Sequence, residues 1–318
     1  MCSNNGDNTR PGKRAKQRAS YRPDDYSDVG QAKVLVEACK DCLCYTEQTD
    51  YLYYDGIRWR EDKLSAQKLV QELTDRQLQE ATDKITRIMR TCADDPNLTQ
   101  ILATRSRPKY LAREQAQLCT DYDEAVAYHK FALQRRNAKY ITAALTVAAP
   151  RLALKVEQLD QNGFLLNTPY GTYDLRNGLG NPQPHNPGDY ITQVTAVSPG
   201  ADGNELWTAF LQQIFCGDEA LIRYIQMVCG LIAIGHVYVE AMIVAVGNGR
   251  NGKSTFFNVI SKALGTYSGN LSADVLTQEC RRNAKPELAL LRGKRLVIAA
   301  ELKSGTSLND SMIKQLCS

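Results

Sequence analysis

The sequence predicts an α/β domain with parallel strands in its last third, preceded by a mainly α-helical region that contains a small amount of β structure. Two apolar, β-prone runs, residues 241–246 and 295–300, enclose a glycine-rich loop and a helical pattern, which is typical of strands alternating with helices. Upstream, apolar residues recur at helical spacing over long stretches. In between, residues 164–195 are dense in glycine, proline and asparagine, which predicts short strands and turns.

The overall composition is that of a folded globular protein. The chain has 318 residues, of which 43% are hydrophobic and 23% charged, so a core can form and the length suits two domains. The mean hydropathy is −0.39, and neither an apolar run of about 18 residues nor an apolar leader segment occurs, so we expect no membrane partner and a cytoplasmic location. The net charge of +4 is too mild to indicate a partner by itself.

Residues 1–32 are expected to form a disordered basic tail, because they contain almost no aliphatic side chains. Six basic residues and no acidic one lie between Arg10 and Arg22. Such a tail can reach phosphates, but a solvated, disordered terminus is the interpretation that we favour.

Three cysteines, Cys39, Cys42 and Cys44, lie close together in the string CKDCLC. Their C-x2-C spacing suits zinc, but a structural zinc site needs a second pair of ligands nearby, and the next cysteines and the three histidines are scattered. We therefore favour free, partly buried thiols over a metal site.

A β-hairpin is predicted at residues 51–59, where aromatic and polar residues alternate around Asp55-Gly56. The aromatic side chains form a small hydrophobic face or, beside Arg58 and Arg60, stack on bases; we favour the first interpretation. Helices follow at 62–89, 106–147 (with turns), 205–215 and 218–234. The cluster Arg135-Arg136-x-x-Lys139 is expected on a solvated helix face.

The loop after the first apolar run reads GNGRNGKST and fits the phosphate-binding pattern G-x-x-x-x-G-K-[ST]. Glycines let the backbone curl so that amide groups point at phosphate oxygens, and the following helix adds the positive end of its dipole. Lys253 is predicted to contact the β- and γ-phosphates of ATP, and the Ser254 hydroxyl to ligate Mg²⁺. The predicted cofactor-binding residues are Gly247, Asn248, Gly249, Arg250, Asn251, Gly252, Lys253, Ser254 and Thr255.

A phosphate-binding loop of this type needs an acid at the end of a neighbouring strand, to hold Mg²⁺ and orient the attacking water. Glu301 is the first acidic residue after the apolar run 295–300. We therefore predict Lys253 and Glu301 as the catalytic pair, with Glu301 holding the metal through water. The alternative is that Glu301 is a solvated residue at a strand end.

In the form G-x-G-x-N-G-K-S-T, the loop resembles the helicase part of phage and plasmid primase–helicases, which are superfamily 3 helicases, and it is similar to the poxvirus replicative NTPase. Residues 287–302 resemble the stretch that leads to the Walker B acid of this family, and 308–316 the helix after it. The upstream stretches 54–59, 165–178, 185–192 and 207–230 resemble the accessory domain that precedes the helicase core.

The resemblance implies an ATP-dependent DNA helicase of phage, virus or mobile-element replication, with an AAA+-like P-loop core. It implies a homo-oligomeric ring, a hexamer in the full-length form. It also implies single-stranded DNA as substrate, primase and replication proteins as partners, and the host cytoplasm as location. The implied domains are an accessory domain at 33–225 and a partial P-loop core at 226–318. No primase domain precedes Val34, so primer synthesis is not expected, and the sensor strand and arginine finger of the family are expected to be missing after Ser318.

Two other functions stay open at this point. The first is a catalytically incomplete module that binds ATP and DNA without turnover. The second is a different P-loop ATPase, such as a transposition or initiator-loading protein, which would leave the upstream resemblance unexplained.

Overall fold

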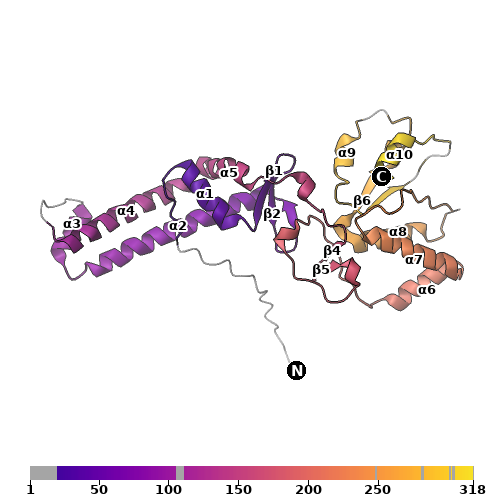
Figure 1. Ribbon diagram of the computed structural model, residues 1–318, viewed down its shortest axis with the longest axis horizontal. Coiled ribbons are helices and arrows are strands. Elements are labelled where there is room, and N and C mark those ends of the chain that lie inside the picture. The colour runs from indigo at the N-terminus through magenta and orange to yellow at the C-terminus, as the bar shows by residue number, and fades with distance from the viewer. Residues whose placement is uncertain are drawn as a thin grey trace, which may run out of the picture. The chain divides into compact units, whose positions relative to one another are not determined.

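The chain folds into two compact units, which we describe separately (Figure 1). Unit 1 consists of Met1–Tyr53 and Glu61–Val156, and unit 2 of Tyr54–Arg60 and Glu157–Ser318. Residues 157–225, expected in the accessory domain, pack in the same unit as the candidate phosphate-binding loop, and the expected boundary at 225/226 stays a prediction. This computed structural model describes residues 20–104, 111–247, 249–280, 283–300, 302 and 305–317.

The described residues of the first half of the chain are mainly helical and include a small sheet of strand order β1-β2-β3, in which Trp59 and Arg60 of β3 are assigned to unit 2. β1 and β2 are antiparallel, with Leu43 opposite Tyr53 and Thr46 opposite Asp50. In chain order the elements are α1 (Asp28–Cys39), β1 (Leu43–Thr46), β2 (Asp50–Tyr54), β3 (Trp59–Glu61), α2 (Lys63–Thr91), α3 (Pro96–Thr104), α4 (Arg113–Arg135) and α5 (Ala138–Leu152).

The long helices α2 and α4 lie side by side in unit 1 (Figure 1). The helix α2 begins at Lys63 because the carboxylate of Asp62 accepts a hydrogen bond from the Ser65 amide at 2.8 Å. Most of its buried side chains recur every three or four residues, so one face of the helix packs inward. A buried pair of amides, Gln31 and Gln77, exchanges two hydrogen bonds of 2.9 and 3.0 Å between α1 and α2.

The beginning of unit 1 differs from the expected disordered tail. Residues 1–19 lie outside the described part of the chain, but from Ser20 on the chain is ordered and α1 begins at Asp28. The Tyr21 amide donates to Glu80 at 2.8 Å, and the Arg22 guanidinium pairs with Glu124 at 2.8 Å. Polar anchors therefore order residues that have few aliphatic side chains, and a composition argument does not detect them.

The prediction of a solvated basic cluster is wrong for Arg135. This side chain is 8% exposed, pairs with Asp28, donates to the carbonyl of Tyr26 at 3.2 Å and lies over the rings of Phe131 and Tyr140. The N-terminus of α1 covers it, and a sequence pattern cannot show this cover. The neighbouring Arg136 and Lys139 are exposed, in line with the prediction.

In its described residues, unit 2 contains three helices of 11 to 15 residues, several shorter segments and two small sheets. β4 and β5 form an antiparallel hairpin, and β6 and β7 are parallel, with Ser268 opposite Leu296 and Ser272 opposite Ala300. The main elements are β4 (Leu165–Thr168), β5 (Gly171–Asp174), α6 (Asn204–Ile214), α7 (Glu219–Ala233), α8 (Lys253–Leu264), β6 (Ser268–Ser272), α9 (Lys285–Ala289), β7 (Leu296–Ala300) and α10 (Asp310–Cys317).

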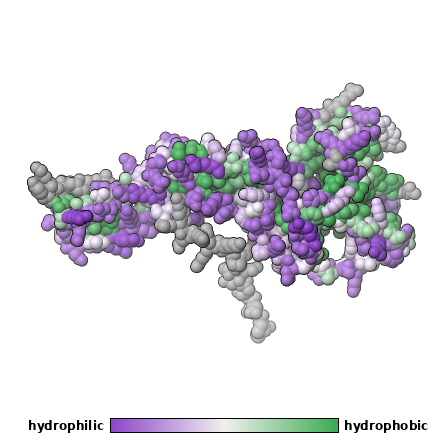
Figure 2. Space-filling view, viewed as in Figure 1, coloured by the Kyte–Doolittle hydropathy of each residue, from purple (hydrophilic) through white to green (hydrophobic). Residues whose placement is uncertain are grey.

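The apolar run 241–246 was predicted as the strand before the loop, and it forms no strand in the structure. In the described ranges no strand pairs with this run, so its backbone N–H and C=O groups have no neighbouring strand to hydrogen-bond. Its side chains are exposed, including Ile243, Val244 and Val246, and Figure 2 shows apolar surface gathered over unit 2. The larger parallel sheet of the expected α/β core stays a prediction.

The predicted hairpin around Asp55-Gly56 forms from β2 and β3, and its tip belongs to unit 2. One carboxylate oxygen of Asp55 accepts from the amides of Ile57 and Arg58, each at 2.9 Å. Trp59 is 2% exposed and its indole donates to the carbonyl of Pro187 at 2.8 Å. The hydrophobic-face interpretation is therefore confirmed for Trp59, which cannot stack on a base in this position.

The cysteines of the CKDCLC string are free thiols, with Cys39 and Cys44 buried and Cys42 half-buried. Within the described ranges, no group of three or more His, Cys, Asp or Glu side chains is placed to share a metal ion. In the same part of the chain, no helix is both long and apolar enough to cross a membrane.

Candidate functional site

An aromatic cluster holds the helix that follows the candidate loop. Phe256, in the first turn of α8, is buried and lies parallel to Trp207 of α6, with ring centroids 5.7 Å apart. The ring of Phe215 meets Phe256 edge-on at 6.3 Å. Because large buried rings contribute most of the apolar contact area in such a cluster, they fix the N-terminus of α8 against α6.

The loop before α8 is curled rather than extended. Three of its residues have positive φ angles: 83° at Gly249, 52° at Arg250 and 80° at Gly252. Glycine adopts this region at little cost, whereas other residues do so rarely. The predicted curl of the backbone is therefore present in the described residues of the loop.

At two glycines of the loop, an added side chain would displace a neighbouring side chain. A Cβ atom on Gly247 would lie 2.0 Å from the side-chain nitrogen of Asn251 and 2.7 Å from Nζ of Lys253. Lys253 Nζ donates to Oδ1 of Asn251 at 2.9 Å, so the ammonium group lies over the Gly247 backbone. A Cβ on Gly252 would lie 2.5 Å from Cγ2 of Ile214, so α6 closes the other side of the loop.

The N-terminus of α8 has amide groups available for an anion. Gly252 is its N-cap and no side chain caps the helix; the first helical bond runs from the Phe256 amide to the Gly252 carbonyl at 2.9 Å. The amides of Lys253, Ser254 and Thr255 therefore have no acceptor inside the helix. Together with the Lys253 ammonium and the positive end of the helix dipole, they provide the donors and the charge that bind phosphate groups in other proteins.

The structure brings together some of the predicted site residues and leaves others untested. Gly247, Asn251 and Lys253 converge, and the hydroxyl-bearing Ser254 and Thr255 are exposed in the first turn of α8. Asn248 and Glu301 lie outside the described residues. β7 ends at Ala300, directly before Glu301, as predicted, and its parallel partner β6 follows α8 in the chain.

A buried polar hub next to α8 was not predicted from the sequence. The side chain of Asn167 is fully buried; its nitrogen donates to the carbonyls of Ile57 and Gln193, both at 3.0 Å. Its oxygen accepts from the Thr172 hydroxyl at 3.0 Å and contacts Nδ1 of His185 at 2.9 Å. An asparagine inside an apolar, β-prone run is the signal that can reveal such a hub, because a buried amide needs partners.

The hub continues to the segment after α8 through Tyr267, whose hydroxyl accepts a hydrogen bond from the backbone N–H of Asn167 at 3.0 Å. Arg295 lies over the Tyr267 ring at 4.3 Å and donates to the carbonyls of Leu165, at 2.6 Å, and Ala233. Burial lowers the pKa of Arg295 and raises the pKa of Asp160, whose carboxylate accepts from Thr192. These contacts connect the β4–β5 hairpin with the elements on both sides of the loop.

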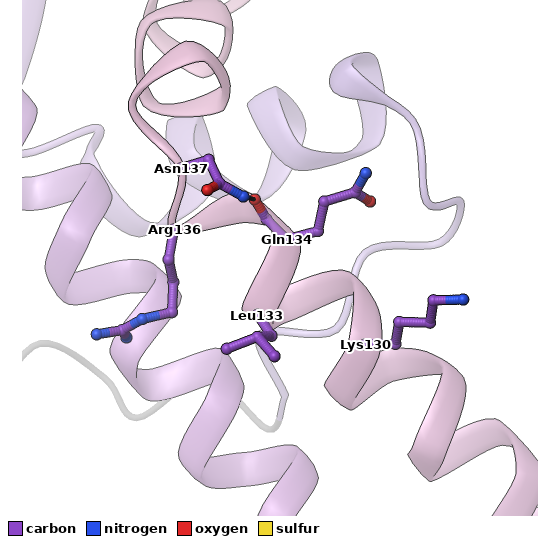
Figure 3. A pocket seen from close by; sticks show the side chains of 5 residues that line it. All are labelled: Lys130, Leu133, Gln134, Arg136 and Asn137. Carbon is purple, nitrogen blue, oxygen red and sulfur yellow. Dashed lines mark hydrogen bonds between the residues drawn. The ribbon is translucent and has the colours of Figure 1, made fainter.

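A surface hollow of about 570 Å³ lies in unit 1, at the junction of α4 and α5, and not at the loop. Lys130 and Arg136 point away from each other there (Figure 3), and the Asn137 side chain donates to the carbonyl of Gln134 at 2.8 Å. A binding pocket needs polar groups that converge on a ligand, so we do not assign this hollow a function. Its lining residues are Lys130, Leu133, Gln134, Arg136 and Asn137.

Comparison with known proteins identifies the region before the loop. Residues 32–216, more than half of the chain, match the family described as "D5 N terminal like". No curated protein matches the chain. The matched range begins within α1, includes the rest of unit 1, the hairpin tip, the Asn167 hub and α6, and ends before the loop.

Proposed function

Since this chain belongs to the D5 N-terminal-like family, found at the N-terminus of phage and viral primase–helicases, we propose that it is an ATP-dependent DNA helicase or NTPase. The family membership itself indicates a primase–helicase-like replication protein. The proposal of nucleotide-driven activity depends on one observation, the curled loop that joins the Lys253 ammonium to the open N-terminus of α8.

The residues of the loop fit a nucleoside triphosphate. The positive φ angles curl the backbone of the loop, and Nζ of Lys253 lies close to the backbone of Gly247. The triphosphate would be held by the amides at the start of α8 and by Lys253, which would exchange its hydrogen bond to Asn251 for phosphate oxygens. ATP supplies the phosphoryl group whose transfer to water drives the reaction.

In the same proposal, the Ser254 hydroxyl and Glu301 would hold Mg²⁺, Glu301 through water, and Glu301 would orient the attacking water. The active form is a ring of identical chains on single-stranded DNA, as the resemblance of the loop to superfamily 3 helicases implies. The buried hub around Asn167 then has a positioning role, because it connects the family-matched region with the segment after α8.

A second candidate function is binding of ATP and DNA without turnover. The observation that favours it is the exposed run 241–246, which in the structure forms no strand to support the loop. A loop that no strand precedes can still bind a phosphate chain through the helix N-terminus. Hydrolysis needs the acid and the attacking water in fixed positions as well.

Replacement of Lys253 by alanine tests the nucleotide site. We expect Lys253→Ala to abolish Mg²⁺-dependent binding of a fluorescent ATP analogue, since it removes the charge that faces the phosphates. Lys262→Ala is the matched control, because Lys262 lies in the last turn of the same helix. Equal binding by the wild type and Lys253→Ala would refute the proposed role of the loop.

Turnover separates the two candidate functions. Phosphate release from ATP, measured with and without single-stranded DNA, should be DNA-stimulated and lost in Glu301→Gln for an NTPase. Retained nucleotide and DNA binding with no phosphate release would favour the module without turnover.

A further inference from the structure

Two of the clustered cysteines meet across a tight turn. Cys39 is the last residue of α1 and is 5% exposed, and Cys42 follows after two residues and is half-buried. The Cys42 amide donates to the carbonyl of Cys39 at 2.9 Å, which closes a four-residue turn. Such a turn keeps the two Cα atoms within about 7 Å, and disulfides span Cα separations of about 4.4–6.8 Å.

The side chains of this pair also interact. The interaction between the two side chains raises the pKa of Cys39 and lowers the pKa of Cys42. Burial adds to the rise at Cys39, and the negative end of the α1 dipole also disfavours a thiolate there. The charged groups that face the pair are Asp41, Glu72 and Arg76. Cys42 is therefore both the more accessible and the more readily ionised sulfur.

We propose that Cys39 and Cys42 form a dithiol–disulfide site that low-molecular-weight disulfides oxidise. The Cys42 thiolate attacks one sulfur of the small disulfide, which breaks its S–S bond and releases one thiol. Cys39 then loses its proton and attacks the Cys42 sulfur of the mixed disulfide, which releases the second thiol. Two protein thiols are oxidised to one disulfide, and the small disulfide is reduced to two thiols.

The surroundings of the pair favour this outcome over simple capping of Cys42. Cys39 belongs to the core of unit 1 and Cys42 packs against the same cluster, so the turn and the packing keep the resolving thiol close to the attacked residue. The third cysteine, Cys44, is buried in β1, and burial raises its pKa to about 12. Cys44 therefore serves as an internal control: it lies in the same short stretch of sequence and is expected to react little.

Lys40 lies between the two cysteines, which makes the bond directly measurable. Trypsin cleaves after Lys40 and separates residues 34–40, which contain Cys39, from residues 41–58, which contain Cys42 and Cys44. The full-length protein is incubated with glutathione disulfide, and free thiols are then blocked with N-ethylmaleimide. Mass spectrometry without reduction is expected to find the two peptides joined in the wild type and in Cys44→Ser, and separated again after dithiothreitol.

The variants decide the assignment. The joined peptides should be absent in Cys42→Ser. Fragmentation of the joined wild-type peptides should locate the bond at Cys42, and this measurement does not depend on the folding of any variant. Separate peptides that carry glutathione or N-ethylmaleimide in the wild type would overturn the proposal. Loss of the joined pair in a folded Cys44→Ser variant, or a bond located at Cys44, would overturn it as well.

Discussion

Replacement of Gly252 by alanine tests how the loop is built. The backbone at Gly252 has φ of 80°, which costs an alanine about 1–2 kcal/mol. The new methyl group would also lie 2.5 Å from Cγ2 of Ile214, and such overpacking costs about 1–3 kcal/mol. We therefore expect Gly252→Ala to lower the free energy of unfolding of unit 2 by about 2–5 kcal/mol.

Urea unfolding followed by tryptophan fluorescence measures this change, because both tryptophans of the chain, Trp59 and Trp207, belong to unit 2. Gly249→Ala is the control: its φ is 83°, but no atom lies within 4 Å of the new Cβ, so only the backbone cost of about 1–2 kcal/mol applies. A loss for Gly252→Ala no larger than for Gly249→Ala would refute the packing of α6 against the loop.

Three further predictions concern the supporting structure. Asn167→Ala leaves buried partners unsatisfied and should lower the free energy of unfolding of unit 2 by about 2–4 kcal/mol in urea titrations; a loss below 1 kcal/mol would contradict the hub. Arg135→Met should lower the free energy of unfolding of unit 1 by about 2 kcal/mol, and Arg136→Met by less than about 1 kcal/mol. Unfolding followed by circular dichroism measures both changes, and equal effects would contradict the burial of Arg135. Because the folded pKa of Asp160 is raised, its folded form binds more protons than its unfolded form, so its stability contribution is present at low pH and declines as pH rises through that pKa. The urea stability of the wild type relative to Asp160→Asn should therefore increase as pH falls from 7 towards 4, and an unchanged difference would contradict the raised pKa.

Local patterns predicted most helices and the hairpin of this fold, because their signals lie within a few residues. The helical spacing after Asp62, the Asp55-Gly56 turn and the helical pattern after the glycine-rich loop each correspond to an element of the structure. The failures at Arg135 and at residues 20–32 have a different cause. Their partners, such as Asp28 and Glu80, lie far away in the sequence, and a single sequence does not show long-range pairing.

In the candidate site, too, local features could be predicted from the sequence and long-range contacts could not. Glycine positions and the adjacent lysine identified the loop, since a curled backbone and a cation have local sequence requirements. The supports of the loop, Ile214 and Trp207, and the Asn167 hub lie in segments that only the fold brings near α8. The run 241–246 was predicted from β-propensity alone, and a strand also needs a neighbour to pair with.

Hydrogen–deuterium exchange of the peptide that covers residues 249–256 tests the central claim most directly. If the amides at the start of α8 bind the phosphates of ATP, their exchange should slow on addition of ATP and Mg²⁺, while exchange in α2 and α4 stays unchanged. The slowing should disappear in Lys253→Ala and persist in Lys262→Ala. Unchanged exchange of this peptide at millimolar ATP and Mg²⁺, in a folded wild-type protein, would contradict nucleotide binding by the loop.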